Sequence, residues 1–372
     1  MTMEVVRGNR GEFAQEAQNS FTLPSRYYTD PQVLKDETRK IFQRSWLYFG
    51  HVTDLSEPGS YFTEELAGQP VLAIRGQDDE IRVFYNICQH RGHLLLEGRG
   101  VVNKRIVCPY HAWCFGLDGA LEIARLTKDV PDFDRADFSL KAVPHAIVAG
   151  MIFINFDPEA KPEDGELGAF EETLLANLPD MPDYVASNRL GFDVAANWKV
   201  VVDNFSEGYH IPIAHPELHT LYNEQGGAAQ VSKRFGFYQK KAKAGYGGFE
   251  TTGDEPYLTW FLWPNLCLLS LPGSDHLVVL RIMPGEAGTS VERADIYSPR
   301  GDSNPNRAVV ETLFAEMFNK EDIALVQSVQ KGLSSLGYDQ GRYVADRAGS
   351  WFSESGLHWF HKQILEALAQ PD

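Results

Sequence analysis

The chain has 372 residues, enough for two domains, and a hydrophobic fraction of 43% that supports buried cores. Its formal net charge of −17 at pH 7 argues against nucleic-acid binding, because the phosphates of nucleic acids require a basic surface. We expect neither a signal peptide nor a membrane span, since the start lacks an apolar segment and the longest apolar runs are short or broken. Cys114 and Cys267 are expected to be buried thiols rather than a disulfide, which favours a reducing cytoplasm.

In chain order, residues 1–43 predict an amino-terminal arm and a helix that packs on the second of two domains. Residues 44–160 carry short strand-like runs broken by Gly, Asp and Asn, which indicate an all-β domain. A Pro- and acid-rich linker at 158–165 leads into residues 161–372, where helical and strand-like patterns alternate. The predicted fold class is α+β: an all-β domain, then a larger α+β domain with an antiparallel sheet flanked by helices.

Two cysteine–histidine pairs lie in the predicted β domain, Cys88 with His90 and Cys108 with His111. Each pair follows a strand-like run, so we expect two loops to close on one metal site. A Rieske [2Fe–2S] cluster has two thiolates on one iron and two imidazoles on the other. Zinc is the alternative, but zinc fingers place both cysteines before both histidines. The order here favours the Rieske cluster, which acts as a one-electron relay.

A second group of candidate metal ligands contains His210 and His215. A His-x4-His pair alone is a weak signal, since most such pairs are ordinary surface or core histidines. An electron relay requires an acceptor, however, and two histidines with one carboxylate form the facial triad of non-haem iron oxygenases. Asp322, near the start of a predicted helix, is our choice of carboxylate, and Glu321 is the alternative.

Glu207 lies three residues before His210, and both would lie on the same face of a helix predicted near 197–210. Its carboxylate could accept a hydrogen bond from the ligating imidazole, as carboxylates behind metal-bound histidines often do. It could also reach a cluster histidine, of which His111 is favoured, and so bridge the two metal sites. The alternative is an ordinary solvated helix residue.

Together these motifs resemble the terminal oxygenase (alpha) component of Rieske non-haem iron oxygenases, over about residues 46–333. The resemblance implies that the [2Fe–2S] cluster is held by Cys88, His90, Cys108 and His111, and the Fe(II) by His210, His215 and Asp322. It also implies a homotrimer in which the cluster of one subunit serves the iron of its neighbour through Glu207. A separate flavin/iron–sulfur reductase would supply electrons from NAD(P)H.

Two positions depart from the commoner pattern of that family. Ala112 replaces the glycine that usually follows the second cluster histidine, and Glu207 replaces the aspartate of ring-dihydroxylating members. A glutamate there resembles the branch that oxidises quaternary ammonium compounds such as choline, carnitine, glycine betaine and proline betaine. A methylated ammonium has no N–H to donate, so aromatic faces recognise it. The ring candidates are Trp260, Trp263, Phe205 and Tyr209, any of which could equally be core.

We therefore expect an O2-dependent monooxygenase that hydroxylates and N-demethylates a small quaternary ammonium compound such as a betaine. The chain lacks a Gly-x-Gly-x-x-Gly loop, so it should not bind the nicotinamide itself. The alternatives are a hydroxylase or dioxygenase of an aromatic ring compound, a Rieske electron carrier without a second iron, and a zinc-stapled binding protein.

Overall fold

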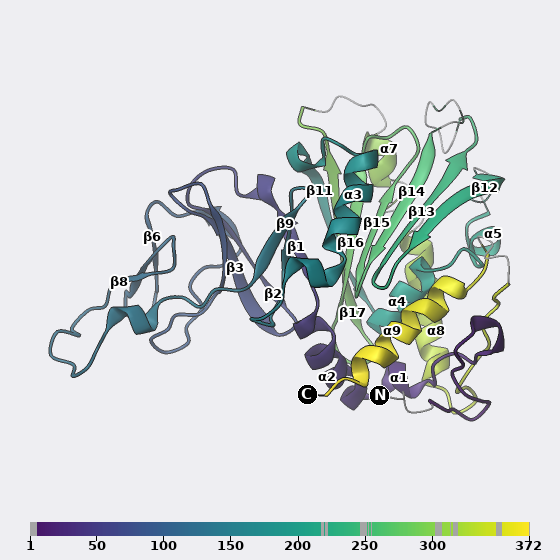
Figure 1. The fold of residues 1–372 in the computed structure, drawn as a ribbon, viewed down its shortest axis with the longest axis horizontal. Coiled ribbons are helices and arrows are strands. Elements are labelled where there is room, and N and C mark those ends of the chain that lie inside the picture. The colour runs from purple at the N-terminus through teal and green to yellow at the C-terminus, as the bar shows by residue number, and fades with distance from the viewer. Residues whose placement is uncertain are drawn as a thin grey trace. The chain divides into compact units, whose positions relative to one another are not determined.

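The computed structural model of the chain describes residues 6–216, 219, 222–245, 251, 253, 255–301, 307–312, 314, 319–346 and 352–371. It forms two compact units, which are described separately (Figure 1). Arg44–Val185 is the β-rich unit, and Met1–Gln43 together with Ala186–Asp372 is the sheet–helix unit. Among the described helices, none combines the length and the apolar composition that a bilayer crossing requires.

The β-rich unit contains three small sheets, with strand orders β4-β3-β2-β5, β1-β10-β9 and β6-β7-β8. Its elements are β1 (Leu47–His51), β2 (Ser60–Leu66), β3 (Gln69–Arg75), β4 (Ile81–Tyr85), β5 (Arg99–Val101), β6 (Arg105–Val107), β7 (Cys114–Gly116), β8 (Leu121–Ile123), β9 (His145–Val148), β10 (Met151–Ile154) and α3 (Leu167–Asn177). The helix α3, which the sequence placed in the second domain, groups with this unit.

One hydrophobic cluster supports both metal-binding loops of the β-rich unit. Leu72 on β3, Ile106 on β6 and Phe115 on β7 are fully buried and pack in the same cluster as Cys88 and Cys108. The strands that precede the two loops are therefore held together by a shared core, which brings both cysteines to one place.

The sheet–helix unit is built on a seven-stranded antiparallel sheet with the order β11-β17-β16-β15-β14-β13-β12. Its strands are β11 (Val185–Val194), β12 (Tyr222–Val231), β13 (Phe235–Ala242), β14 (Pro256–Leu262), β15 (Leu266–Ser270), β16 (Leu277–Pro284) and β17 (Ser290–Ser298). Its helices are α1 (Arg26–Thr29), α2 (Pro31–Lys40), α4 (Trp198–Phe205), α5 (Ile211–Ala214), α7 (Arg307–Thr312), α8 (Asn319–Leu333) and α9 (Ser355–Leu368). The predicted α+β fold class is confirmed.

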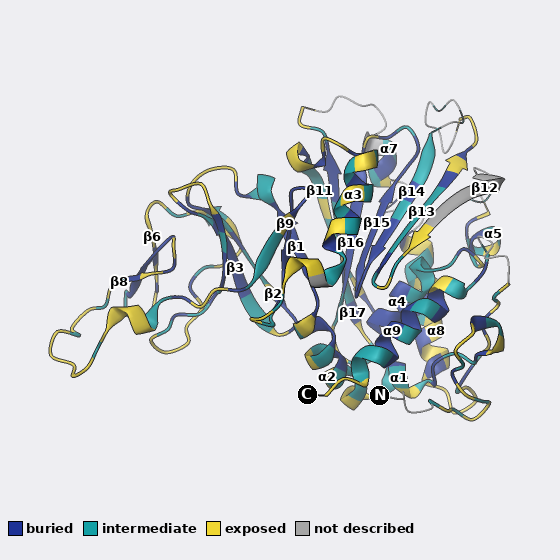
Figure 2. Ribbon diagram, viewed as in Figure 1, coloured by how far each residue is buried: buried dark blue, intermediate teal, exposed yellow. Residues whose placement is uncertain are grey.

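The central strands of this sheet are buried on both faces, as Figure 2 shows. The sequence predicted one strand-like run over 259–271, whereas the structure has two strands, β14 and β15, joined at Trp263–Asn265. Pro264 lies in this connection, where its missing N–H costs no ladder hydrogen bond.

A buried ion pair fastens the amino-terminal helix α2 to α4. Lys199 Nζ lies 2.7 Å from Glu37 Oε1, and both side chains are fully buried. The indole Nε1 of Trp198 donates to Glu37 Oε2 at 2.8 Å. Asn197 caps α4 by accepting from the Lys199 amide. These contacts position α4, the helix that leads into the histidine segment.

Candidate metal centre and adjoining cavity

The structure brings His210, His215 and Asp322 together. One ligand atom from each of the three side chains lies within 4.8 Å of the others. Asp322 Oδ1 is 2.9 Å from His215 Nε2 and 3.6 Å from His210 Nε2. Two imidazole nitrogens and a carboxylate oxygen that converge in this way form the donor set of a non-haem ferrous site with open positions.

The histidines are held by a turn and a short helix rather than by one long helix. The helix predicted near 197–210 ends at Phe205, and His210 immediately precedes α5. Pro212 lies in the first turn of α5, where a missing backbone N–H is tolerated. His215 follows the last residue of α5, so the four-residue helix separates the two ligands.

Each histidine has a carboxylate behind it. Glu207 Oε1 lies 2.5 Å from His210 Nδ1, and Glu321 Oε2 lies 2.6 Å from His215 Nδ1. When Nδ1–H donates to a carboxylate, the Nε2 atom is left unprotonated and directed at the metal. The adjacent acids Glu321 and Asp322 therefore occupy different places: Asp322 joins the triad, and Glu321 orients His215. The sequence alone indicates Glu321 only as an alternative iron ligand.

Asn204 and Asp203 were not predicted as site residues. Asn204 Nδ2 donates to Asp322 Oδ1 at 3.2 Å and lies 3.4 Å from His210 Nε2. Asp203 turns the other way, where its carboxylate accepts from Tyr28 at 3.0 Å and lies 2.9 Å from His361 Nε2. Of these two adjacent residues of α4, Asn204 therefore contacts α8 at the metal centre, and Asp203 contacts α1 and α9 on another side of the helix.

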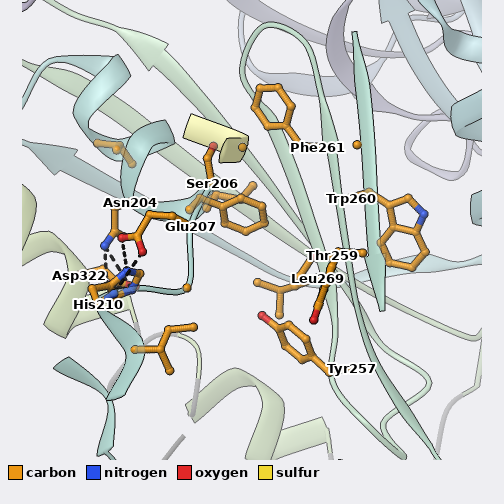
Figure 3. Close-up of a pocket in the computed structure, with 18 of the residues that line it drawn as sticks. Asn204, Ser206, Glu207, His210, Tyr257, Thr259, Trp260, Phe261, Leu269 and Asp322 are labelled. Carbon is orange, nitrogen blue, oxygen red and sulfur yellow. Dashed lines mark hydrogen bonds and ion pairs between the residues drawn. The ribbon is translucent and has the colours of Figure 1, made fainter. Parts of the chain in front are cut away.

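A cavity of about 480 Å³ adjoins the triad. In Figure 3, His210, Asp322, Glu207 and Asn204 gather on one side of it, and Tyr257, Thr259 and Phe261 lie opposite. Its aromatic lining comprises Phe205, Tyr238, Tyr257, Phe261, Phe314 and Trp359, with Trp260 and Phe237 also contributing. An aromatic cavity of this size beside open metal positions is suited to hold a small organic molecule.

The four aromatic residues that the sequence suggests for binding a methylated ammonium lie in different environments. Phe205 and Trp260 both line the cavity. The Trp260 indole, however, lies on the opposite side of β14 from Thr259, where it packs against Phe237 (Figure 3). Trp263 is buried outside the lining. Tyr209 is 51% exposed and also lies outside the lining.

In the β-rich unit, the two cysteine–histidine loops repeat one backbone pattern. The amide four residues after each cysteine donates to the cysteine carbonyl, Gly92 to Cys88 and Ala112 to Cys108, both at 3.0 Å. Gly92 and Ala112 have φ values of +73° and +56°, a region that favours glycine. Ala112 therefore keeps the geometry of the glycine it replaces, at the cost of a left-handed backbone.

The side chains of these loops fit a mixed thiolate–imidazole cluster. Cys88 and Cys108 are both 2% exposed. The His90 and His111 rings lie with centroids 4.7 Å apart, and Trp113 stacks on His90. His111 Nδ1 is buried without a hydrogen-bond partner, as expected for an imidazole nitrogen that is reserved for iron.

Comparison with known families agrees with both sites. Residues 45–134 match the family described as the Rieske [2Fe-2S] domain, and residues 181–370 match the ring hydroxylating alpha subunit, catalytic domain. The chain belongs to the Rieske non-haem iron oxygenases. It therefore carries a Rieske [2Fe–2S] cluster and a mononuclear iron, and it works with a separate reductase.

Similar proteins place the chain in the quaternary-ammonium branch of this family. The carnitine monooxygenase oxygenase subunit of Escherichia coli (strain K12) is 34% identical over 370 residues, 96% of each chain. The chloroplastic choline monooxygenase of Amaranthus tricolor is 30% identical over 364 residues, 95% of this chain and 79% of that protein. The solved structure of the quaternary ammonium Rieske monooxygenase CntA with L-carnitine superposes with a TM-score of 0.87 at 33% identity, covering 95% and 97% of the two chains.

A naphthalene 1,2-dioxygenase shares the fold at 21% identity, with a TM-score of 0.77 over 94% of this chain and 92% of that chain. The similarities to the carnitine and choline monooxygenases confirm the expected family and the monooxygenase class. A bare Rieske electron carrier and a zinc-stapled binding protein would not contain the catalytic domain that residues 181–370 form.

Proposed function

We propose that this protein is the oxygenase subunit of a monooxygenase that hydroxylates a methyl group of a small quaternary ammonium compound. Electrons would come from NAD(P)H through the separate reductase, and the enzyme would work in the cytoplasm. The observation that carries this function is the aromatic cavity adjoining the His210, His215 and Asp322 triad. Aromatic faces bind a methylated ammonium, and open metal positions accept dioxygen.

The metal assignments follow the donor geometry. Cys88, His90, Cys108 and His111 would hold the [2Fe–2S] cluster, and His210, His215 and Asp322 would hold the iron. The bound iron would supply dioxygen activation. The reaction consumes O2, two electrons and two protons, converts one C–H bond to C–OH and releases water. The resulting N-hydroxymethyl ammonium then loses its hydroxyl proton as its C–N bond breaks, which gives formaldehyde and the demethylated amine.

The protein side chains act by orientation and by exclusion of water. Glu207 and Glu321 hold the two imidazoles, and the rings opposite the triad would press a methyl group toward the open metal positions. The apolar lining keeps bulk water from the reacting carbon until substrate fills the cavity.

Glu207 also supports electron transfer between subunits of a homotrimer. Its carboxylate contacts His210 Nδ1, and the next residues toward the surface are exposed: Tyr209 at 51% and Ile213 at 87%. Large exposed apolar side chains beside a metal centre are typical of a surface that a partner covers. We assign that surface to a neighbouring subunit, whose His111 would contact Glu207.

A substrate panel tests the function. The iron-loaded oxygenase, reduced with dithionite and mixed with O2, should release formaldehyde with at least one methylated ammonium compound from a panel of choline, glycine betaine and carnitine. Benzoate and other aromatic acids should give no coupled product. Coupled hydroxylation of an aromatic acid, with no product from any ammonium compound, would contradict the proposal.

A further inference from the structure

We propose that the preferred substrate carries a net positive charge, as an ammonium alcohol or methylated amine without a carboxylate does, and that Glu292 is its counter-charge. This inference rests on the proposed function and narrows its substrate class. It concerns a side chain of the cavity that the metal centre does not use.

Glu292 is a buried carboxylate on the cavity wall. It lies on β17, is 1% exposed and belongs to the cavity lining. Its Oε1 atom is buried without a hydrogen-bond partner. Alternate residues of a strand share a face, so Glu292 points the same way as Ala294, which pairs with the cavity residue Leu280. A buried carboxylate oxygen with no donor is costly unless a ligand supplies the missing partner.

The other two carboxylates of the lining are already engaged. Asp322 belongs to the metal triad, and Glu207 holds His210. Burial raises the pKa of Glu292 to about 7, while a side-chain hydrogen bond from Asn319 opposes this shift and the negative charge of Asp322 adds a smaller rise. A fixed positive charge in the cavity would favour its ionised form.

The aromatic lining supplies the rest of a cation site. The Phe261 and Trp359 rings meet edge to face, with centroids 5.7 Å apart and planes at 80°. Tyr238 adds a half-buried ring to the same lining, and burial raises its pKa to about 12. Ring faces attract a desolvated cation more strongly than a solvated one.

The described part of the cavity lining contains no lysine or arginine, and its two histidines belong to the metal triad. A zwitterion such as a betaine would bring a carboxylate into a cavity whose described lining holds Glu292 but no lysine or arginine. The desolvated carboxylate would then lack a cationic partner, which is unfavourable. Lys240 shares a sheet face with Tyr257 as its cross-strand neighbour, but it lies outside the lining and already has an interaction partner.

The test measures binding to the holoprotein by calorimetry, without reductant or O2, using three probes of similar shape. Choline is a cation, glycine betaine is a zwitterion and 3,3-dimethylbutan-1-ol is the neutral carbon isostere of choline. Choline should bind at least about tenfold more tightly than either of the other two.

In Glu292→Gln, the affinity for choline should fall to that for the isostere. The affinity for the isostere should stay within about twofold of its value in the unaltered protein. Glu286→Gln removes the same charge from the exposed turn between β16 and β17 and should leave the choline preference intact. Lys240→Met tests the rival cation and should not change the ranking of the three probes. Thermal unfolding and iron content verify that each variant is folded and loaded.

Tighter binding of glycine betaine than of choline would overturn the inference while leaving the proposed function standing. If glycine betaine binds more tightly than choline and this preference disappears in Lys240→Met, Lys240 binds the substrate carboxylate and the inference is wrong. If the ratio of the choline affinity to the isostere affinity is unchanged in Glu292→Gln, Glu292 is not the counter-charge and the inference is wrong. Failure of every ammonium compound both to bind and to give product would overturn the proposed function as well.

Discussion

At the scale of single residues, the metal centre depends on carboxylates that do not face the metal. Glu207 and Glu321 each accept from the Nδ1 atom of one ligating histidine, so that both Nε2 atoms are available together beside Asp322. Such partners fix the ring orientation and increase the basicity of the ligand. The acid pair Glu321–Asp322 shows that adjacent carboxylates on a helix can serve one site in two ways.

Glu321→Ala is predicted to weaken iron binding by about 10- to 100-fold, because His215 loses the acceptor that orients its ring. Competition with a ferrous chelator measures this change. Glu286→Ala, at an exposed turn, provides the matched control and should retain the original iron affinity. Equal iron affinity in Glu321→Ala and the unaltered protein would show that Glu321 does not support the ligand.

At the scale of elements, α4 connects the amino-terminal helix to the metal centre. One end of α4 carries Lys199, which pairs with Glu37 of α2 in a fully buried position. The other end carries Asn204, which contacts Asp322 on α8. Burial raises the pKa of Glu37 and lowers that of Lys199, while each partner opposes these shifts by favouring the charged form of the other.

Lys199→Met is predicted to lower the free energy of unfolding by about 3–5 kcal/mol, because it leaves the Glu37 carboxylate buried without its cation. The double variant Lys199→Met/Glu37→Leu should recover much of this loss. Arg39→Met breaks the exposed pair with Asp36 and should cost about 0–1 kcal/mol. Urea unfolding of the unaltered protein, Lys199→Met, Glu37→Leu and the double variant measures the coupling, with Arg39→Met as the control, and additive losses in the double variant would argue against a coupled pair.

The element that carries the histidines was only partly predictable. The residue types and their spacing predicted His210 and His215 as a pair of metal ligands, and the structure brings both imidazoles beside Asp322. The predicted helix through His210 was wrong, since α4 stops at Phe205. Glu207 accepts from the backbone amides of Tyr209 and His210, and this local turn competes with the helix. The contact between Glu207 and His210 therefore forms through a turn.

At the scale of the whole molecule, the sequence predicted both metal sites and the α+β fold class, because ligand types and strand periodicity are local signals. It did not predict the cavity wall. The side of β14 on which the Trp260 indole lies depends on the strand register (Figure 3). Glu292 lines the cavity from β17 because β17 pairs with β16 in the same antiparallel sheet. A carboxylate in an ordinary strand pattern gives no sign of being buried beside a metal centre.

The central claim is that electrons pass from the cluster to the iron through Glu207 when a quaternary ammonium substrate is bound. The decisive measurement is a single turnover of dithionite-reduced holoprotein mixed with an accepted substrate from the panel and O2, in which visible absorbance reports cluster oxidation and formaldehyde reports product.

In the unaltered protein, cluster oxidation should keep pace with product formation. In Glu207→Gln, with both metals retained, both rates should fall together by about 10- to 100-fold, because the amide cannot serve as the charged bridge. Cluster oxidation and product formation at unaltered rates in Glu207→Gln would contradict the account.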